Sequence, residues 1–389
     1  MLGTGNSFLM RVMQSVRVGR QVLPENPPYF IREELVPAGR FVEVWFLTSG
    51  CRWDRAGSCT MCNYGRGPAI SEAAMIDAVR RGLAEVRWPA EELVVSPSGS
   101  MLDDREVPPG ARAAILSLLA ELPVKKLLFE TRSETVTEQV MDELKRALGG
   151  CPVTIEIGIE SADPWVSRYC INKIAGDHRR AIQVVRNHGF GSCVNVLLGA
   201  PFLSPAEAVA DCVATVEWAY KAGADSVVVF PVHAKPFTLA GLMASEGRFR
   251  PPSLWALVET LRRLAPEQQR QTAIAWYKNY IPELPPVALP TTCPACEGVV
   301  LTLLDRYRAT QSAEVLESLA NFDCACRHRW LEEMAAPEAI PLPSRVAAAC
   351  DWLAGHLNLI GWWGPNRDGY LAEMAASFYA GRIDACPCS

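Results

Sequence analysis

The chain has 389 residues, of which 49% are hydrophobic and 21% charged, and its formal net charge at pH 7 is −5. This size and composition predict a globular protein with one large domain and an appendage, or with two domains. The negative charge and the lack of a long Lys or Arg run argue against nucleic acid as a partner, and no apolar stretch approaches the roughly 20 residues that span a bilayer.

The N-terminal segment MLGTGNSFLMRVMQ has too short an apolar part for a signal peptide and no clear cleavage site, so we expect a cytoplasmic protein. Thiols stay reduced in that compartment, and the fourteen cysteines are therefore not expected to form disulfides. Clustered cysteines in such a protein indicate metal binding or catalysis. The cysteines that are isolated in sequence are expected to be buried structural thiols: Cys151, Cys170, Cys193, Cys212 and Cys350.

From residue 42 to about residue 232, short apolar runs rich in β-branched residues alternate with helical segments. Such runs are typical of buried parallel strands, so their order predicts six β/α units, arranged as an open doubly wound sheet or a barrel. The predicted strands are 42–48, 93–97, 125–130, 153–159, 192–200 and 225–232.

The segments between these strands carry helix start and stop signals. The motif SPAE at 204–207 is a capping box with Pro at the first helical position, and we expect its helix to end before Gly223. Ser133 is predicted to cap a helix that ends at Gly149, and Asp177 is predicted to cap the next one.

The composition changes after about residue 280, where the segment IPELPPVALPTTCPAC is rich in proline and predicts a linker. Helical patterns dominate beyond it, and cysteine pairs lie at both ends of that region. We therefore predict an N-terminal extension (1–40), a barrel (41–285) and a small, mostly helical, cysteine-rich metal-binding domain (286–389).

Three cysteines follow the first predicted strand in a C-x7-C-x2-C spacing: Cys51, Cys59 and Cys62. The C-terminal ends of barrel strands form the active-site face, so this loop is expected to lie there. Structural zinc requires four ligands, and the loop contains no histidine. Three thiolates fit an iron–sulfur cluster better, and one iron without a protein ligand could bind a substrate.

The loop and its place after the first strand resemble the radical S-adenosylmethionine (radical SAM) superfamily. The resemblance implies a partial (β/α)6 TIM-like barrel, a 4Fe–4S cluster on Cys51, Cys59 and Cys62, and S-adenosylmethionine on the open iron. One electron then releases a 5′-deoxyadenosyl radical. That superfamily commonly has a C-x3-C-x2-C spacing with an aromatic residue before the last cysteine; here the residue is Met61, and Tyr64 could substitute.

Further candidate ligands of S-adenosylmethionine follow the next strands. The segment SPSGSMLDD resembles a turn near the methionine amino group, where Gly99 and Ser100 suit close backbone approach. Glu130 and Glu160 are expected to bind ribose hydroxyls, and Arg132 to clamp the methionine carboxylate. Salt-bridged strand ends are the alternative interpretation.

Three longer segments narrow the resemblance: GIESADPWVSRYCINKIAG, LLGAPFLSPAEA and KPFTLAGLMASEGRFRPPSLWALVETL. They resemble the Elongator-catalytic-subunit-like radical SAM group, and within it the archaeosine-biosynthesis lyases, over roughly residues 40–330. Those lyases cleave a C–N bond in a lysine-modified deazaguanine base of tRNA. Because this chain is acidic and lacks a basic arm, we expect a smaller nucleoside-like or amino-acid-conjugate substrate, and a one-electron reductant such as flavodoxin or ferredoxin.

A second cysteine group has the pattern C-x2-C…C-x-C, which is a strong metal-binding signal: Cys293, Cys296, Cys324 and Cys326. A zinc tetrathiolate would fasten the C-terminal region to the barrel. An auxiliary 4Fe–4S cluster would face the active site and could donate sulfur to the substrate. We expect the auxiliary cluster, because the chain already carries one cluster and Cys386 and Cys388 add two thiols.

Two residues beyond the sixth strand, His233 and Lys235, are candidate substrate ligands, with a structural histidine as the alternative. Asp103 and Asp104 are interpreted as solvated loop acids. The sequence thus predicts hydrogen abstraction followed by sulfur insertion. The alternatives are a C–N lyase with a structural zinc, and a non-catalytic, zinc-stabilised binding module.

Overall fold

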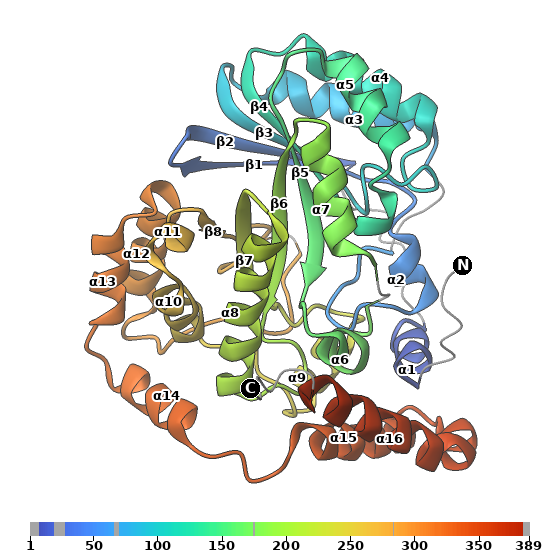
Figure 1. Ribbon diagram of the computed structural model, residues 1–389, viewed down its shortest axis with the longest axis vertical. Helices are drawn as coiled ribbons and strands as arrows, with labels where there is room; N and C mark the ends of the chain where they lie inside the picture. The colour runs from blue at the N-terminus through green and yellow to red at the C-terminus, as the bar shows by residue number, and fades with distance from the viewer. Residues whose placement is uncertain (1–7, 19–27, 66–69, 174–175, 283, 384–389) are drawn as a thin grey trace.

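The computed structural model describes residues 8–18, 28–65, 70–173, 176–282 and 284–383. Its centre is an eight-stranded sheet whose strands follow one another in chain order and curl into a half-barrel (Figure 1). The first two strands form an antiparallel hairpin, and all later neighbours are parallel. The strands are β1 (Tyr29–Val36), β2 (Gly39–Phe46), β3 (Ala90–Pro97), β4 (Val124–Thr131), β5 (Val153–Glu160), β6 (Gly191–Leu198), β7 (Ser226–Pro231) and β8 (Thr272–Ile274).

The six predicted strands are confirmed as β2 to β7, and β1 and β8 were missed. β1 has the sequence YFIREELV, whose three charged residues hide the strand pattern, and β8 has only three residues. β1 and β8 are the two edge strands of the sheet. An edge strand has only one neighbouring strand and therefore needs less apolar surface.

Two of the three predicted helix caps are confirmed. Ser204 forms the predicted capping box with Glu207, and Asp177 accepts a hydrogen bond from the Arg180 amide (2.9 Å). The prediction for Ser133 is wrong, because Ser133 lies in a short 3-10 turn and contacts His178. The helix starts later, with the side chain of Thr137 as its cap.

Strand residues alternate between two environments. At every second position, apolar side chains such as Val44 in β2 and Ile155 in β5 point outward and pack beneath the helices. At the positions between them, side chains such as Glu43 and Glu156 point inward and line a cavity inside the half-barrel. Because successive strand side chains point to opposite faces, the sheet has an apolar outer face and a polar inner face.

Helices cover the outer face and bury their apolar sides against it. These helices are α3 (Glu72–Glu85), α4 (Pro109–Ala120), α5 (Glu138–Leu148), α7 (His178–Asn187), α8 (Pro205–Ala222) and α10 (Leu254–Arg263). Short helices complete the connections: α2 (Arg52–Ala56), α6 (Pro164–Val166), α9 (Leu239–Ser245) and α11 (Pro266–Gln269).

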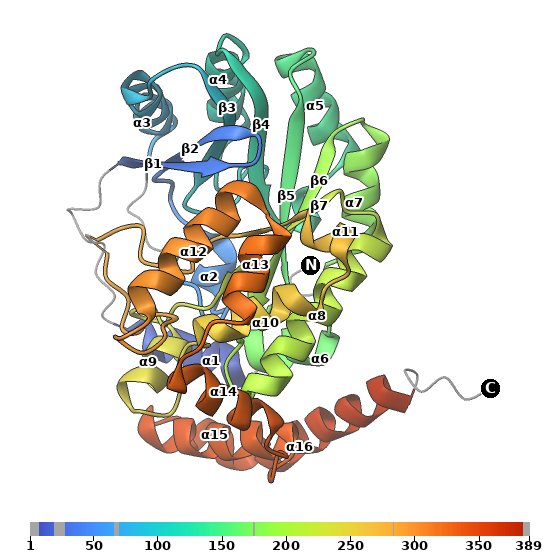
Figure 2. The same cartoon turned by 90° about the vertical axis from the view of Figure 1, so that its left-hand side faces the viewer.

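The C-terminal region is helical, as predicted, and it contacts the sheet and the N-terminal helix α1 (Phe8–Val16). Its helices are α12 (Glu297–Thr310), α13 (Ala313–Ala320), α14 (Ala325–Ala335), α15 (Leu342–His356) and α16 (Ile360–Ile383). α12 and α13 lie beside the open side of the half-barrel, and α15 and α16 run beneath it (Figure 2). Phe8 of α1 packs on Trp363 of α16, with ring centroids 4.2 Å apart.

The cysteines in the described part of the chain are all free thiols, as expected. Of the isolated ones, Cys151 is half-buried and the other four are buried. Cys386 and Cys388 lie outside the described residues. No helix within the described ranges has the length and apolar character to cross a membrane.

Candidate active site

The cysteine loop follows β2 at the C-terminal edge of the parallel strands, and Cys51, Cys59 and Cys62 all line the cavity. In the described part of the chain, the sulfur atoms of these three cysteines are not all within 4.8 Å of one another. Those of the second cysteine group, Cys293, Cys296, Cys324 and Cys326, are. Wider spacing suits a 4Fe–4S cluster, because each thiolate binds a different iron. Burial raises the pKa of Cys51 and of Cys59 to about 12, so a metal cation is needed to keep them as thiolates. The loop therefore fits the expected cluster.

Two distant segments hold the loop in place. The Cys59 amide donates to the carbonyl of Asn172 (3.2 Å), which lies after β5. Arg17, just beyond α1, donates to the carbonyls of Ser58 (2.9 Å) and Cys62 (3.2 Å). The N-terminal segment is thus part of the site, and sequence reasoning missed Arg17 because its contacts are 41 and 45 residues away.

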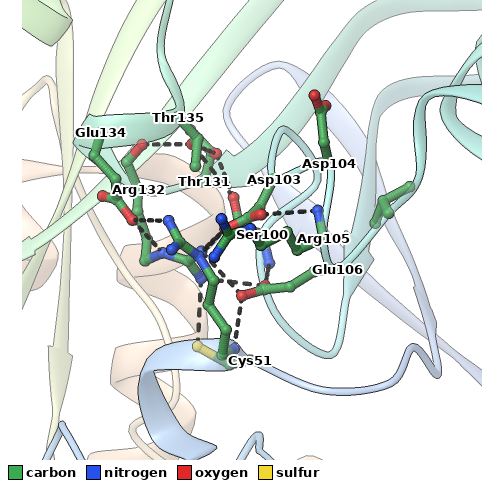
Figure 3. Close-up of polar contacts among 12 residues, drawn as sticks. Cys51, Ser100, Asp103, Asp104, Arg105, Glu106, Thr131, Arg132, Glu134 and Thr135 are labelled. Atoms are coloured by element: carbon green, nitrogen blue, oxygen red, sulfur yellow. Dashed lines mark hydrogen bonds and ion pairs between the residues drawn. The ribbon is translucent and has the colours of Figure 1, made fainter. Parts of the chain in front are cut away.

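Arg132 lies beside the first cysteine (Figure 3). Its Nη1 donates to Cys51 Sγ (3.3 Å) and to Glu106 Oε2 (3.1 Å), and its Nε donates to Glu134 Oε1 (2.9 Å). Its Nη2 pairs with Asp103. The guanidinium is therefore engaged by the protein on every side, which is the salt-bridged arrangement.

Asp103 is only 5% exposed and pairs with both Arg52 and Arg132, so its interpretation as a solvated acid is wrong. Two buried arginine contacts compensate its charge. Asp104, in contrast, has a 61% exposed side chain that pairs with Arg112.

Glu106 connects the turn after β3 to the cysteine loop; Figure 3 shows it between Ser100 and Cys51. Its Oε2 accepts from the Ser100 amide (2.7 Å) and its Oε1 from the Arg52 amide (2.7 Å). A Cβ at Gly99 would collide with Glu106 and lie 3.5 Å from Cys51 Cα, so only glycine fits there. The Ser100 hydroxyl is hydrogen-bonded to Thr131 (2.6 Å) and is not among the cavity-lining side chains.

Glu160 ends β5 at a bulge and has a positive φ of 64°, which orients its carboxylate toward Lys173. Lys173 also donates to the Gly158 carbonyl (2.6 Å). Burial lowers the pKa of Lys173 to about 8. Both side chains line the cavity close to the cysteine loop.

The cavity has a volume of about 480 Å³ and follows the inner face of the strands down from the cysteine loop. The acidic side chains that line it include Glu43 of β2, Glu92 of β3, Glu130 of β4 and Glu156 of β5, besides Glu160 close to the cysteine loop. Burial raises the pKa of Glu130 and Glu156, and the repulsion between neighbouring carboxylates raises both further. Sequence reasoning missed Glu43 and Glu156, although a charged residue at alternate positions of an apolar strand marks an inner face.

His233 and Lys235 both line the cavity beyond β7. A ring nitrogen of His233 contacts the Trp276 carbonyl, and burial lowers the pKa of His233 to about 4, so the imidazole is neutral. Lys235 Nζ lies 4.7 Å from the centre of the Tyr64 ring and 5.9 Å from that of Trp276. These contacts give one end of the cavity an aromatic and cationic wall.

The second cysteine group lies where α12 and α14 begin. The sulfurs of Cys293 and Cys296 are 3.5 Å apart, as are those of Cys296 and Cys326, and Cys293 and Cys324 are 3.6 Å apart. The Trp255 indole donates to Cys326 Sγ (3.2 Å). None of the four is among the described residues that line the cavity.

No family model matches the chain. It is 30% identical over 346 residues to archaeosine synthase subunit beta of Methanosarcina acetivorans, which covers 84% of this chain and 94% of that protein. It is 26% identical over 302 residues to archaeosine synthase subunit beta of Thermococcus kodakarensis, which covers 73% of this chain and 88% of that protein.

Similar solved structures include the archaeal Elp3 of Methanocaldococcus infernus, with a TM-score of 0.44 and 15% identity over 60% of this chain and 58% of that chain. A queuine lyase from Clostridium spiroforme has a TM-score of 0.40 and 18% identity over 52% of this chain and 79% of that chain.

The curled parallel sheet, the three-cysteine loop beyond its first parallel strand and the similarity to archaeosine synthase subunit beta define a radical SAM enzyme. The chain belongs to the archaeosine synthase subunit beta family. Both conclusions confirm the resemblance drawn from the sequence segments. The class works with a 4Fe–4S cluster and S-adenosylmethionine, in agreement with the three thiols that line the cavity.

Proposed function

We propose that this protein is a radical SAM lyase that cleaves a C–N bond in a small nucleoside-like or amino-acid conjugate. The relatives named archaeosine synthase subunit beta support the reaction class that the family resemblance implies. The net charge of −5 and a cavity of about 480 Å³ support a small substrate, because that volume is typical of small-molecule sites.

In this proposal Cys51, Cys59 and Cys62 hold the cluster. When bound there, the cluster and S-adenosylmethionine would supply the radical chemistry of the class, in which a 5′-deoxyadenosyl radical takes a hydrogen atom from the substrate. The backbone of the turn at Gly99 and Ser100 offers close approach to S-adenosylmethionine, and Glu160 offers a carboxylate to its ribose.

Arg132 acts through Cys51, whose sulfur it contacts, rather than as a free clamp for the methionine carboxylate. The inner wall of the half-barrel orients the substrate and excludes water. His233 and Lys235, which line the cavity beyond β7, are proposed to contact the substrate.

The observation that favours a lyase over sulfur insertion is the geometry of the second cysteine group. Four of its six sulfur pairs lie 3.5–3.6 Å apart and all lie within 4.8 Å, close to the ~3.8 Å between tetrahedral ligands on one zinc ion with Zn–S bonds of ~2.3 Å. A sulfur donor must also reach the substrate, and these four cysteines are absent from the described cavity lining. We therefore propose that Cys293, Cys296, Cys324 and Cys326 bind one structural zinc.

Metal and sulfide analysis of anaerobically reconstituted protein tests this proposal. We expect about four irons, four sulfides and one zinc per chain. Replacing Cys293 and Cys296 with Ala should remove the zinc and lower thermal stability, and 5′-deoxyadenosine should still form. As the matched control, replacing Cys59 and Cys62 with Ala should remove the iron and abolish 5′-deoxyadenosine. About eight irons together with a sulfur-containing product would establish sulfur insertion instead.

Two relatives are named as subunits, so we propose that a second protein chain works with this one. A flavodoxin- or ferredoxin-type protein is the proposed electron donor. The free thiols agree with the reducing cytoplasm as the compartment.

A further inference from the structure

The C-terminal end of helix α1 contacts the cysteine loop. The Arg17 amide donates to the Met13 carbonyl (3.1 Å), so Arg17 continues the hydrogen-bond ladder of the helix. A Cβ at Gly57, the residue that ends α2, would lie 2.8 Å from the carbonyl oxygen of Met10. Because Gly57 also has a φ of 98°, a glycine is needed for α1 to pack so closely on the loop.

The Arg17 guanidinium bridges backbone carbonyls around two of the three cysteines. It donates to the carbonyls of Ser58 (2.9 Å), Cys59 (3.4 Å) and Cys62 (3.2 Å). A guanidinium is planar and presents its donors as a rigid fork, so one group sets the spacing of three peptide units. Two of these peptide units belong to proposed cluster ligands, and Arg17 therefore influences where their sulfur atoms lie.

A buried ion pair connects Arg17 to both ends of the loop. The guanidinium pairs with the Asp54 carboxylate of α2, and the same carboxylate accepts a hydrogen bond from the Gly65 amide. The side chains of Arg17 and Asp54 are 7% and 1% exposed, so water screens their attraction little. Removing Arg17 would take a cation from a buried carboxylate, which costs free energy within the loop.

The other end of α1 is seated among aromatic side chains of α16. Phe8 is fully buried, and its ring centroid lies 4.2 Å from that of Trp363, 6.0 Å from that of Trp362 and 6.4 Å from that of Tyr370. Phe8 and Arg17 lie nine positions apart, so about 14 Å of helix separates this aromatic seat from the loop.

One apolar cluster joins these two ends of α1. It contains Leu9, Val12 and Met13 of α1 together with Val346 of α15 and Met61 of the cysteine loop. The three α1 side chains are fully buried. A closely packed helix transmits strain along its length, so the packing of Phe8 on α16 bears on the position of Arg17.

We propose that α1 is a latch on the cysteine loop. Arg17 is its positioning residue and fixes the loop around Cys59 and Cys62, and the seat of Phe8 on α16 holds Arg17 in place. The inference rests on the proposed function, in which the loop carries the cluster. It gives an N-terminal helix and a C-terminal helix a shared role in retaining that cluster.

Two variants of the full chain, Arg17→Met and Phe8→Ala, test the latch. In the iron-free protein, trypsin should cut after Arg55, which is exposed on α2, roughly tenfold faster than in the unchanged chain, because the loop opens more often. In the reconstituted protein, transfer of iron to a chelator should be roughly tenfold faster. The electron paramagnetic resonance spectrum of the reduced cluster should broaden, because the ligand positions vary.

Matched variants separate the latch from a general loss of stability. Tyr379→Ala, at an exposed aromatic residue of α16, and Arg55→Met, at an exposed arginine of the loop, should release iron at the original rate. Arg17→Lys should give an intermediate rate, because an ammonium keeps the charge without the fork. The double variant of Arg17→Met and Phe8→Ala should release iron no faster than Arg17→Met alone, because both changes remove one device.

Unchanged iron release in a correctly folded Arg17→Met or Phe8→Ala variant overturns the proposal. Thermal melting establishes folding, and where one of these variants does not fold, Arg17→Lys or Phe8→Leu takes its place with the same criterion. Iron uptake and 5′-deoxyadenosine formation by the unchanged protein are measured separately. A chain that takes up no cluster contradicts the proposed function, whereas proteolysis of the iron-free protein still reports on the latch.

Discussion

Arg132 joins the cysteine loop to the acids of two neighbouring loops. It donates to Cys51 Sγ and to Glu106, and it pairs with Asp103. Hydrogen bonds to ligand sulfur stabilise the more negative, reduced form of an iron–sulfur centre. With Cys51 as the proposed cluster ligand, we expect Arg132 to tune and position that ligand without touching S-adenosylmethionine.

We expect Arg132→Gln to make the cluster harder to reduce. Loss of one charge-assisted hydrogen bond, worth ~1 kcal/mol between the two redox states, lowers the midpoint potential by about 40 mV. A redox titration followed by electron paramagnetic resonance measures this shift. Arg132→Lys should shift the potential less, and Arg105→Gln, at an exposed arginine on the loop of Asp103 and Glu106, should not shift it. An unchanged potential in Arg132→Gln would show that the contact with Cys51 has no electronic effect.

At the scale of elements, α12 connects the two ends of the sheet order. Arg308 of α12 pairs with Glu34 of β1 at 2.7 Å and donates to the carbonyl of Ile274 in β8. Arg308 is 6% exposed, so both contacts are shielded from water. The helix thereby stabilises the open side of the half-barrel, which is the side where an ordinary barrel closes by strand pairing.

Removing this link should destabilise the protein. We expect Arg308→Met to lower the free energy of unfolding by about 2 kcal/mol, because Glu34 then stays buried with Arg32 (3.1 Å) as its remaining partner. Chemical denaturation measures the change. Arg306→Met, at an exposed position of the same helix, is the control and should change stability little. Equal stability of both variants would mean that Arg308 does not hold the sheet ends together.

At the scale of the whole molecule, net charge bears on substrate size. A protein that makes six to ten phosphate contacts loses about 10³–10⁵ in affinity between 50 and 200 mM salt. The chain carries 38 basic and 43 acidic residues, and the arginines and lysines of its cavity are largely paired with carboxylates. Within the cavity, most of these cations are therefore already compensated.

We accordingly expect that the KM for a small substrate changes less than about threefold between 50 and 200 mM salt, because no phosphate-rich backbone is neutralised. Unmodified tRNA should compete poorly with that substrate at either salt concentration. Steady-state kinetics at the two salt concentrations checks both statements. A steep rise of KM with salt, together with strong competition by tRNA, would indicate a polynucleotide substrate instead.

The chain order of β2 to β7, the capping box at Ser204 and the three-cysteine loop were all predictable from the sequence. They depend on local properties: strand runs are set by apolar β-branched residues, caps by short-range hydrogen bonds, and the loop by cysteine spacing. The prediction of three parts, 1–40, 41–285 and 286–389, stays a prediction. Its boundaries are crossed by the contact of Arg17 with the cysteine loop and by the contacts of Arg308 with β1 and β8.

Other features were decided by tertiary structure alone. The pairing of Arg17 with the cysteine loop, the ion pairs of buried Asp103 and the meeting of Glu130 with Glu156 join residues that lie 26 to 51 positions apart. No local pattern encodes such distances, because they depend on strand register and on how the sheet curls. The residue types therefore determined the chemistry that this protein carries, and the packing of the half-barrel determined which of those groups face one another.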